Sequence, residues 1–270
     1  MNVEIINTGN ELLNGKVKNT NLQWLIKKLN RYGARIIQCT VVPDDLECIG
    51  STLQAALERS ADFIITTGGL GATYDDMTLK AISEVLNRPL KLNSHALEMV
   101  ESKFEYAKRL GWTDADLISE HWKKMAVIPE DSIPLENPPG AAPGVQIEFN
   151  GKTIFVLPGP PNELKAIFRR SILPLLKKRI KNKTPEARFY VKGLIEPTIS
   201  GIIDSTFKKF KGVWVKSHPM LHTGKLMLEI HITLQEGYNS VDLVEAAKLY
   251  FIREIEKLGR GQIIMDLEGD

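Results

Sequence analysis

The chain has 270 residues, 43% of them hydrophobic, so it is long enough to bury one large core or two smaller ones. Its 35 basic and 33 acidic residues leave a net charge of +2, which disfavours a strongly basic binder of nucleic acid or membranes. Two cysteines, Cys39 and Cys48, are too few for a disulfide framework and lack zinc-site spacing. Because we find no secretory signal and no apolar run of about 18 residues, we expect a soluble, cytoplasmic protein without membrane contact.

The first half of the chain alternates short β-branched runs with helical patterns. The runs lie at 3–9, 34–42 and 62–69, and the helical patterns lie at 21–32 and 46–60. This order predicts a parallel sheet with helices on its faces. The runs are apolar almost throughout, as expected for strands that are covered on both sides. The predicted class is therefore α/β, with a mostly parallel sheet sandwiched by helices.

The next region is expected to hold more helices and strands, ending in a hairpin and a long helix. In chain order, these are helices at 78–86, 94–110 and 114–124, strands at 126–128, 145–149 and 151–159, and a helix from 161 or 162 to about 181.

The polar, charged segment 181–188 has the composition of an inter-domain linker, and we place a boundary near residue 183. The predicted domains are therefore 1–183 and 184–270. Beyond the linker we expect a strand at 189–193, a helix at 198–210, strands at 213–217 and 226–234, and a helix at 241–258. This βαββα order predicts a small α+β subdomain with two helices on one face of its sheet.

Three glycine-rich turns, at 7–15, 66–76 and 157–163, each follow a predicted strand. In a parallel sheet such turns gather at the carboxyl edge, where ligands bind. Gly68, Gly69 and Gly71 would let the backbone approach a ligand and turn its N–H groups toward an anion such as phosphate. A tight turn without a ligand is the competing interpretation.

Acidic residues follow the middle turn and the second predicted strand. Asp75 and Asp76 would repel a phosphate unless a divalent cation bridged them, although either could instead cap the helix that begins near Thr78. Asp44 and Asp45 should face the same crevice, or form an ordinary turn and helix cap. A metal-bridged phosphate is the sharper hypothesis.

The two outer turns carry polar residues of undecided role. Asn10, Glu11 and Asn21 could bind a ribose, base or phosphate, or simply cap helices. Gly159 and Pro160 lead into a helix whose first turn holds Glu163, which could bind metal or only favour the helix dipole. The five histidines form no HExxH motif, and no serine lies in a nucleophile elbow, which disfavours zinc hydrolysis and acyl-enzyme chemistry.

Six motifs together resemble the N-terminal domain of the CinA family, itself similar to MoaB/MogA molybdopterin-binding proteins, over about residues 1–175. They are "GNELLNG", "TNLQWL", "VVPDD", "TTGGLGATYDDMT", "AAPG" and "FVLPGPPNEL". Ala72 stands where the family usually has proline, and "ISEHWKKMAVIP" replaces a stretch that usually contains Asn and Gln, which bears on the substrate. The tail resembles the KH-like subdomain of the family but lacks a clear GxxG loop, so nucleic acid binding is not expected. The amidohydrolase domain of some members is not expected either.

The resemblance implies a divalent-metal-dependent pyrophosphohydrolase that splits an ADP-ribose-like nucleotide, with Mg²⁺, Mn²⁺ or Co²⁺ as cofactor and a dimer or trimer as assembly. Asp44, Asp76 and Glu11 are the expected catalytic residues, and Asp44, Asp75 and Asp76 the metal ligands. The expected substrate- or phosphate-binding residues are Gly9, Asn10, Asn21, Gly68, Gly69, Gly71, Thr73, Gly144, Gly159 and Pro160. The alternatives are a molybdopterin-binding or adenylylating protein and a non-catalytic nucleotide- or RNA-binding module.

Overall fold

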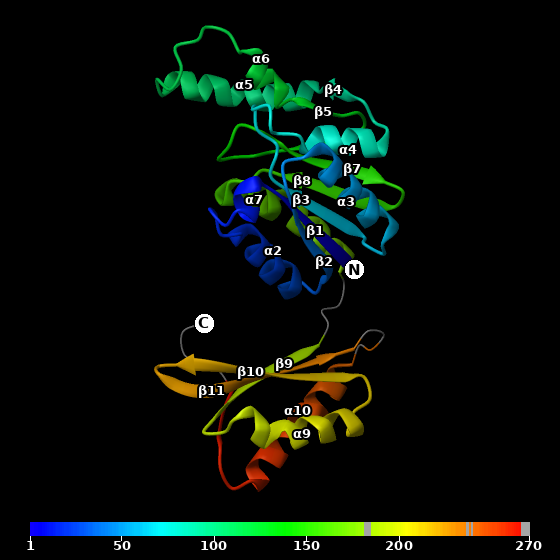
Figure 1. Ribbon diagram of the computed structural model, residues 1–270, viewed down its shortest axis with the longest axis vertical. Helices are drawn as coiled ribbons and strands as arrows, with labels where there is room; N and C mark the ends of the chain where they lie inside the picture. The colour runs from blue at the N-terminus through cyan, green and yellow to red at the C-terminus, as the bar shows by residue number, and fades with distance from the viewer. Residues whose placement is uncertain (181–184, 236–237, 239, 266–270) are drawn as a thin grey trace. The chain divides into compact units, whose positions relative to one another are not determined.

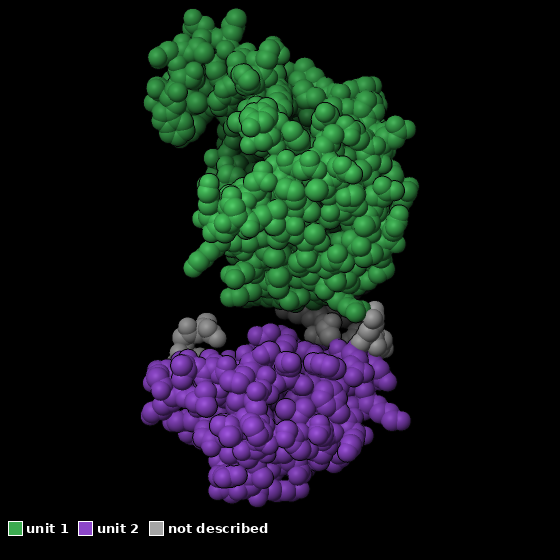
Figure 2. All heavy atoms as spheres, viewed as in Figure 1, with its two compact units in different colours: residues 1–181 green, residues 182–270 purple. Residues whose placement is uncertain are grey.

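The computed structural model describes residues 1–180, 185–235, 238 and 240–265. The chain divides into two compact units, unit 1 (Met1–Lys181) and unit 2 (Asn182–Asp270), coloured separately in Figure 2. The predicted boundary near residue 183 lies outside the described residues. Within the described part of the chain, no helix combines the length and apolar character needed to cross a bilayer.

Unit 1 is built on a six-stranded sheet with the strand order β2-β1-β3-β8-β7-β6. Strands β2, β1, β3 and β8 pair in parallel, whereas β7 and β6 add an antiparallel edge. The strand bounds are β1 (Asn2–Thr8), β2 (Arg35–Val42), β3 (Phe63–Thr67), β6 (Ile133–Leu135), β7 (Gly144–Phe149) and β8 (Lys152–Leu157). The predicted mostly parallel sheet and the β7–β8 hairpin are confirmed.

Helices cover both faces of this sheet, so unit 1 has three layers (Figure 1). Neighbouring residues of β1 point to opposite cores: Ile6 packs with α3 (Leu46–Glu58) and α4 (Thr78–Leu86), and Ile5 packs on the side of α2 (Thr20–Arg31). Helices α7 (Pro161–Ile167) and α8 (Leu173–Arg179) complete the second layer. Strands covered on both faces must be apolar throughout, which explains the sequence pattern.

Two predicted helices differ from the structure. The helix expected at 161–181 is interrupted by a π-helical turn, η1 (Phe168–Ile172), which lies between α7 and α8. The helix expected at 114–124 is only α6 (Glu120–Lys124), whereas α5 (Ser94–Arg109) forms close to its predicted bounds. Ile118 packs against the core, but Leu117 is 82% exposed, so the segment before α6 buries too little apolar surface to stabilise a longer helix.

Several short elements were not predicted. They are α1 (Asn10–Leu13), β4 (Leu90–Leu92), β6 in the main sheet, and β12 (Gln262–Ile264). Strand β4 pairs with β5 (Val127–Pro129), the strand expected at 126–128, and the two form a small separate sheet. Segments of three or four residues are too short for a hydrophobic period to reveal them.

Unit 2 is an antiparallel sheet of order β10-β11-β9-β12 with α9 (Glu196–Lys209) and α10 (Val241–Lys257) on one face, as predicted (Figure 1). Its long strands are β9 (Glu186–Lys192), β10 (Val213–His222) and β11 (Lys225–Leu234). Strand β10 extends five residues past the expected Ser217, because Thr223 and Gly224, with φ of 48° and 73°, form a two-residue hairpin turn.

Candidate functional site

The carboxyl edge of the unit 1 sheet contains a cavity of about 390 Å³. Its walls come from the loops that follow β1, β2, β3 and β8, together with residues 141–142 before β7. The predicted site residues that line it are Glu11, Asp44, Gly68, Gly69, Gly71, Asp75, Asp76, Gly159, Pro160 and Glu163. The sheet therefore brings the three glycine-rich turns, Asp75, Asp76 and Asp44 to one place, as the parallel topology requires, whereas Asp45 does not line the cavity.

Five predicted residues do not line this cavity: Gly9, Asn10, Asn21, Thr73 and Gly144. Gly144 is the first residue of β7 and is buried, and a Cβ there would lie 3.2 Å from atoms of Ile167, so its small size serves helix packing. Asn21 donates from its amide to the carbonyl of Gly159 at 2.7 Å, which ties α2 to the third glycine-rich turn. Both residues support the cavity wall from behind.

The backbone of the middle turn requires glycine at two positions. Gly68 and Gly69 have φ of 97° and 68°, a region that L side chains rarely adopt. A Cβ at Gly68 would overlap the backbone carbonyl of Thr8, and a Cβ at Gly69 would overlap the Thr78 hydroxyl. That hydroxyl donates to the carbonyl of Gly68 at 2.9 Å, so the turn is held against the first residue of α4.

The N–H donors available to a ligand come from part of this turn. The N–H of Gly68 donates to the carbonyl of Leu157 at 2.9 Å and so continues the sheet instead of facing the cavity. Within the described residues, the N–H groups of Gly69, Leu70 and Gly71 make no hydrogen bond. Successive amides in such a turn form an anion-binding concavity, which we call the nest (Gly69–Gly71).

The two aspartates after the nest differ in their contacts. Asp76 accepts hydrogen bonds at its Oδ2 from the N–H and the hydroxyl of Thr73, at 2.9 and 2.5 Å, and this carboxylate packs where a Cβ on Gly71 would stand. Asp75 is exposed, and the nearby Thr73 side chain lowers the pKa of its carboxyl, with a smaller contribution from Lys124. Lys124 also donates to the carbonyl of Thr73. Thr73 therefore organises the acidic end of the turn.

The aspartates after β2 also have separate roles. Asp44 lines the cavity, and its Oδ2 accepts a hydrogen bond from the N–H of Asn10 at 2.8 Å, so it links the first two loops. Asp45 caps α3 by accepting from the N–H of Cys48 at 2.9 Å, which lowers the pKa of its carboxyl. Asp45 is therefore a helix cap, and of these two aspartates only Asp44 can contact a ligand in the cavity.

Glu163 is held by residues that sequence reasoning missed. The amide nitrogen of Asn137 donates to the Glu163 carboxylate and to the carbonyl of Ala142, each at 2.7 Å. Gly140 donates from its backbone to the Asn137 oxygen at 3.2 Å, and a Cβ on Gly140 would overlap the Glu163 carboxylate. Asn137 is only 4% exposed, so this network is fixed inside the protein. The only sequence signal was the glycine and proline content of the loop.

Thr8, at the end of β1, was also missed. It lines the cavity and is 4% exposed, and its buried hydroxyl oxygen has no hydrogen-bond partner in the described structure. A buried polar atom without a partner costs free energy, so a hydroxyl in this position is suited to a ligand that completes its hydrogen bonding. Its place directly before Gly9 at the end of a strand was the available signal.

The charged residues that line the cavity are all acidic, and Lys124 lies outside the lining. Five carboxylates line the cavity, from Glu11, Asp44, Asp75, Asp76 and Glu163, and no lysine, arginine or histidine does. Yet the described residues contain no group of three His, Cys, Asp or Glu side chains arranged to hold a metal ion. Asp44, Asp75 and Asp76 therefore share a cavity without forming a protein-only metal cage, because Asp44 and Asp76 are turned toward backbone N–H groups.

Known proteins share both the sequence and the fold of this chain. The sequence profile described as a probable molybdopterin binding domain matches residues 4–178. A protein of Aeropyrum pernix is 37% identical over 259 residues, covering 95% of this chain and 92% of the relative. Protein PH0439 of Pyrococcus horikoshii is 36% identical over 215 residues, covering 80% and 82%.

A solved structure matches unit 1. The protein CinA of Thermoplasma acidophilum, described as having unknown function, is 34% identical with a TM-score of 0.58. The match covers 65% of this chain and 99% of that protein. The resemblance drawn from six short motifs is therefore confirmed, and this chain belongs to the probable molybdopterin binding domain family, with a CinA-like unit 1.

Proposed function

We propose that unit 1 is a divalent-metal-dependent pyrophosphohydrolase that acts on an ADP-ribose-like nucleotide. The observation that supports it best is the combination, in one cavity, of three available N–H donors with five carboxylates and no basic side chain among the lining residues. The N–H donors suit phosphate oxygens, whereas the carboxylates would repel them unless a cation lay between. A pyrophosphate accompanied by a divalent metal ion satisfies both requirements.

The carboxylates of the cavity suit a metal ion that is bound jointly by the protein and the substrate. Mg²⁺ is usually held by one or two carboxylates together with substrate phosphate oxygens and water, not by a protein cage. The Oδ1 atoms of Asp44 and Asp76 make no hydrogen bond within the described residues, and Asp75 is exposed. These three side chains would hold Mg²⁺, Mn²⁺ or Co²⁺ with the substrate. A bound divalent ion neutralises charge on the phosphoryl oxygens and lowers the pKa of the attacking water.

The protein groups then have distinct roles in hydrolysis. The nest amides and the Thr8 hydroxyl bind the pyrophosphate oxygens, and the carboxylate of Glu11 accepts a proton from the attacking water. The water oxygen bonds to one phosphorus while the bond from that phosphorus to the bridging oxygen breaks. One water is consumed, AMP and ribose 5-phosphate leave, and the proton passes from Glu11 to solvent. Glu163, held by Asn137, is the second candidate for the base.

The test compares two variants that each lose one carboxylate charge, one inside the cavity and one outside it. Asp76→Asn keeps an oxygen that can accept from Thr73 but loses the charge, and should lower kcat for ADP-ribose by at least about a hundredfold. Asp45→Asn is the matched control, because Asp45 caps α3 and does not line the cavity. Product formation is measured by chromatography with Mg²⁺, Mn²⁺ and Co²⁺ in turn. Full activity of Asp76→Asn would refute the site.

The second candidate function is the binding or adenylylation of molybdopterin in the same cavity. The observation that favours it is the match of residues 4–178 to the probable molybdopterin binding domain. Pterin fluorescence in the purified protein, with ATP-dependent adenylylation and no hydrolysis of ADP-ribose, would decide for this alternative. The absence of both signals alongside metal-dependent AMP release would decide against it.

A further inference from the structure

A second cavity of about 350 Å³ lies on the other side of one loop from the first. Ala141 lines both cavities, Ala142 lines only the first, and Gly140 and Pro143 line only the second. The loop 137–143 is therefore a shared wall, and a ligand in the first cavity that extends past Ala141 would enter the second.

This wall is fixed by contacts on both of its sides. Asn137 lines the second cavity while its amide holds Glu163, which lines the first. Lys103 of α5, which also lines the second cavity, donates from its ammonium to the carbonyl of Pro138. Because both cavities depend on the same hydrogen-bonded loop, their positions relative to each other are set in advance of binding.

The side chains of the second cavity suit a hydroxyl-bearing ligand. His95, Glu98 and Ser102 of α5 line it together with Glu136 and Asn137, so hydrogen-bonding side chains make up most of its polar lining. Glu136 is held by Arg170 at 2.8 Å, and the Lys103 ammonium is committed to the loop, so the oxygens of Glu98 and Glu136 dominate as acceptors. Carboxylates accept hydrogen bonds from ribose hydroxyls in nucleotide-binding proteins, whereas they repel phosphate. Met99 is the only large apolar residue of the lining, which disfavours a hydrophobic guest.

We propose that the second cavity binds the sugar hydroxyls of the substrate whose pyrophosphate lies at the nest, so that the site is bipartite across the 137–143 loop. This inference rests on the proposed function and assigns a subsite within it. Specificity for a nucleoside-diphosphate sugar, as opposed to a bare pyrophosphate, then comes from Glu98, Ser102 and Glu136. A site that hydrogen-bonds substrate hydroxyls discriminates strongly against ligands that lack them.

The experiment fills the second cavity without touching the first. Ser102 is exposed on α5 and lines only the second cavity, so Ser102→Trp should occupy it without disturbing the core. Glu101→Trp is the matched control, because Glu101 is exposed on the same helix and does not line the cavity. Steady-state kinetics of the full chain with Mg²⁺ measure the KM of ADP-ribose and the inhibition constant of inorganic pyrophosphate. We expect Ser102→Trp to weaken the binding of ADP-ribose about tenfold or more, which corresponds to losing one or two hydrogen bonds. The binding of pyrophosphate should be unchanged.

Each other outcome overturns a defined part of the argument. Binding of neither ligand by the wild-type protein contradicts the proposed function itself. Wild-type binding together with an unaltered Ser102→Trp variant removes the sugar subsite and leaves the nest assignment intact. Equal weakening of both ligands, or equal effects of the two tryptophan variants, also removes it, because the change would then act outside the second cavity. If the wild-type protein binds only ADP-ribose, the sugar subsite is supported when Ser102→Trp weakens that binding more than Glu101→Trp does, and it is removed when the two variants are equal.

Discussion

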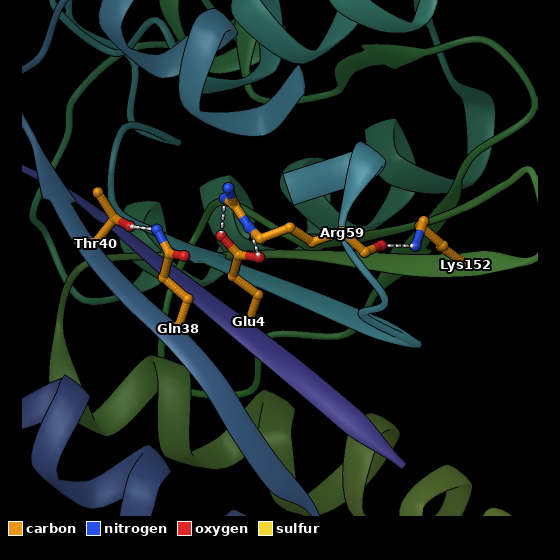
Figure 3. Close-up of polar contacts among 5 residues, drawn as sticks. All are labelled: Glu4, Gln38, Thr40, Arg59 and Lys152. Carbon is orange, nitrogen blue, oxygen red and sulfur yellow. Dashed lines mark hydrogen bonds and ion pairs between the residues drawn. The ribbon is translucent and has the colours of Figure 1, made fainter. Parts of the chain in front are cut away.

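Arg59 holds the carboxylate of Glu4, which is completely buried, with two hydrogen bonds, from Nε at 2.9 Å and from Nη2 at 2.5 Å (Figure 3). Lys152 extends the arrangement by donating from Nζ to the carbonyls of Arg59 and Ala61 at 2.6 and 2.8 Å. Glu4 lies in β1, an interior strand of the sheet, and Lys152 lies in β8, so these contacts join the end of α3 to the two strands that flank β3. A buried carboxylate is tolerated because both of its oxygens are paired.

Arg59→Met should therefore destabilise unit 1 strongly. Removing one partner of a buried ion pair leaves an uncompensated charge, which costs about 3 kcal/mol where the other partner is partly exposed, and the Arg59 side chain is 34% exposed. Urea unfolding followed by circular dichroism measures the change. The double variant Glu4→Met, Arg59→Met should recover most of the loss, and Lys91→Met, which breaks an exposed pair with Glu130, should leave stability unchanged. Equal stability of Arg59→Met and wild type would contradict the expectation.

Gly68→Ala should damage both stability and the cavity. The new methyl group would overlap the Thr8 carbonyl, which belongs to the backbone of β1 and has no freedom to move aside. Gly151→Ala is the control, because Gly151 has a φ of 78° but open space around a Cβ, so it carries only the conformational cost of about 1–2 kcal/mol. Thermal melting should show a larger loss for Gly68→Ala, and ADP-ribose turnover should fall only in that variant. Similar losses in both would mean that steric overlap at Gly68 is unimportant.

Asp45 should make folding stability depend on pH in the acidic range. The Cys48 N–H lowers the pKa of its carboxyl in the folded chain below the unfolded value of about 4. The stabilisation by the ionised cap is then present above the unfolded pKa and is lost as the pH falls through the folded pKa. Asp45→Asn keeps a cap acceptor that does not titrate, so its unfolding free energy should change less between about pH 5 and pH 2. An unfolding free energy that depends on pH in the same way in both proteins, measured by urea unfolding, would contradict the stabilising role of the ionised Asp45 cap.

The parts of the fold that the sequence predicted are those whose signal is local. Strands β1 and β3 are apolar throughout because helices cover both of their faces, and that pattern is readable without the structure. The π-helical turn η1 has no comparable signal. Its Phe168 packs edge-on against Trp24 of α2, with ring centroids 5.1 Å apart, so its geometry depends on packing between distant segments.

In the candidate site, too, features with a local sequence signal were predicted and contacts between distant segments were not. Glycine marked the turn at Gly68 and Gly69, because only glycine readily adopts the dihedral angles found there. The hydrogen bond from Gly68 to Leu157 was not predictable, since it depends on the pairing of β3 with β8. Asn137 lies 26 residues before Glu163 in the chain, and only the folded loop shows that the two side chains meet.

The middle glycine turn presents main-chain donors, whereas the carboxylates around it come from side chains on several separate loops. The two parts can therefore diverge independently through evolution. Substitutions at Glu11, Asp75 or Glu163 would change the acidic side chains of the lining without altering the amide geometry, which is encoded by the glycines and by the sheet behind them. A mutational library confined to those three side chains would therefore vary the chemistry of the cavity on an unchanged main-chain scaffold.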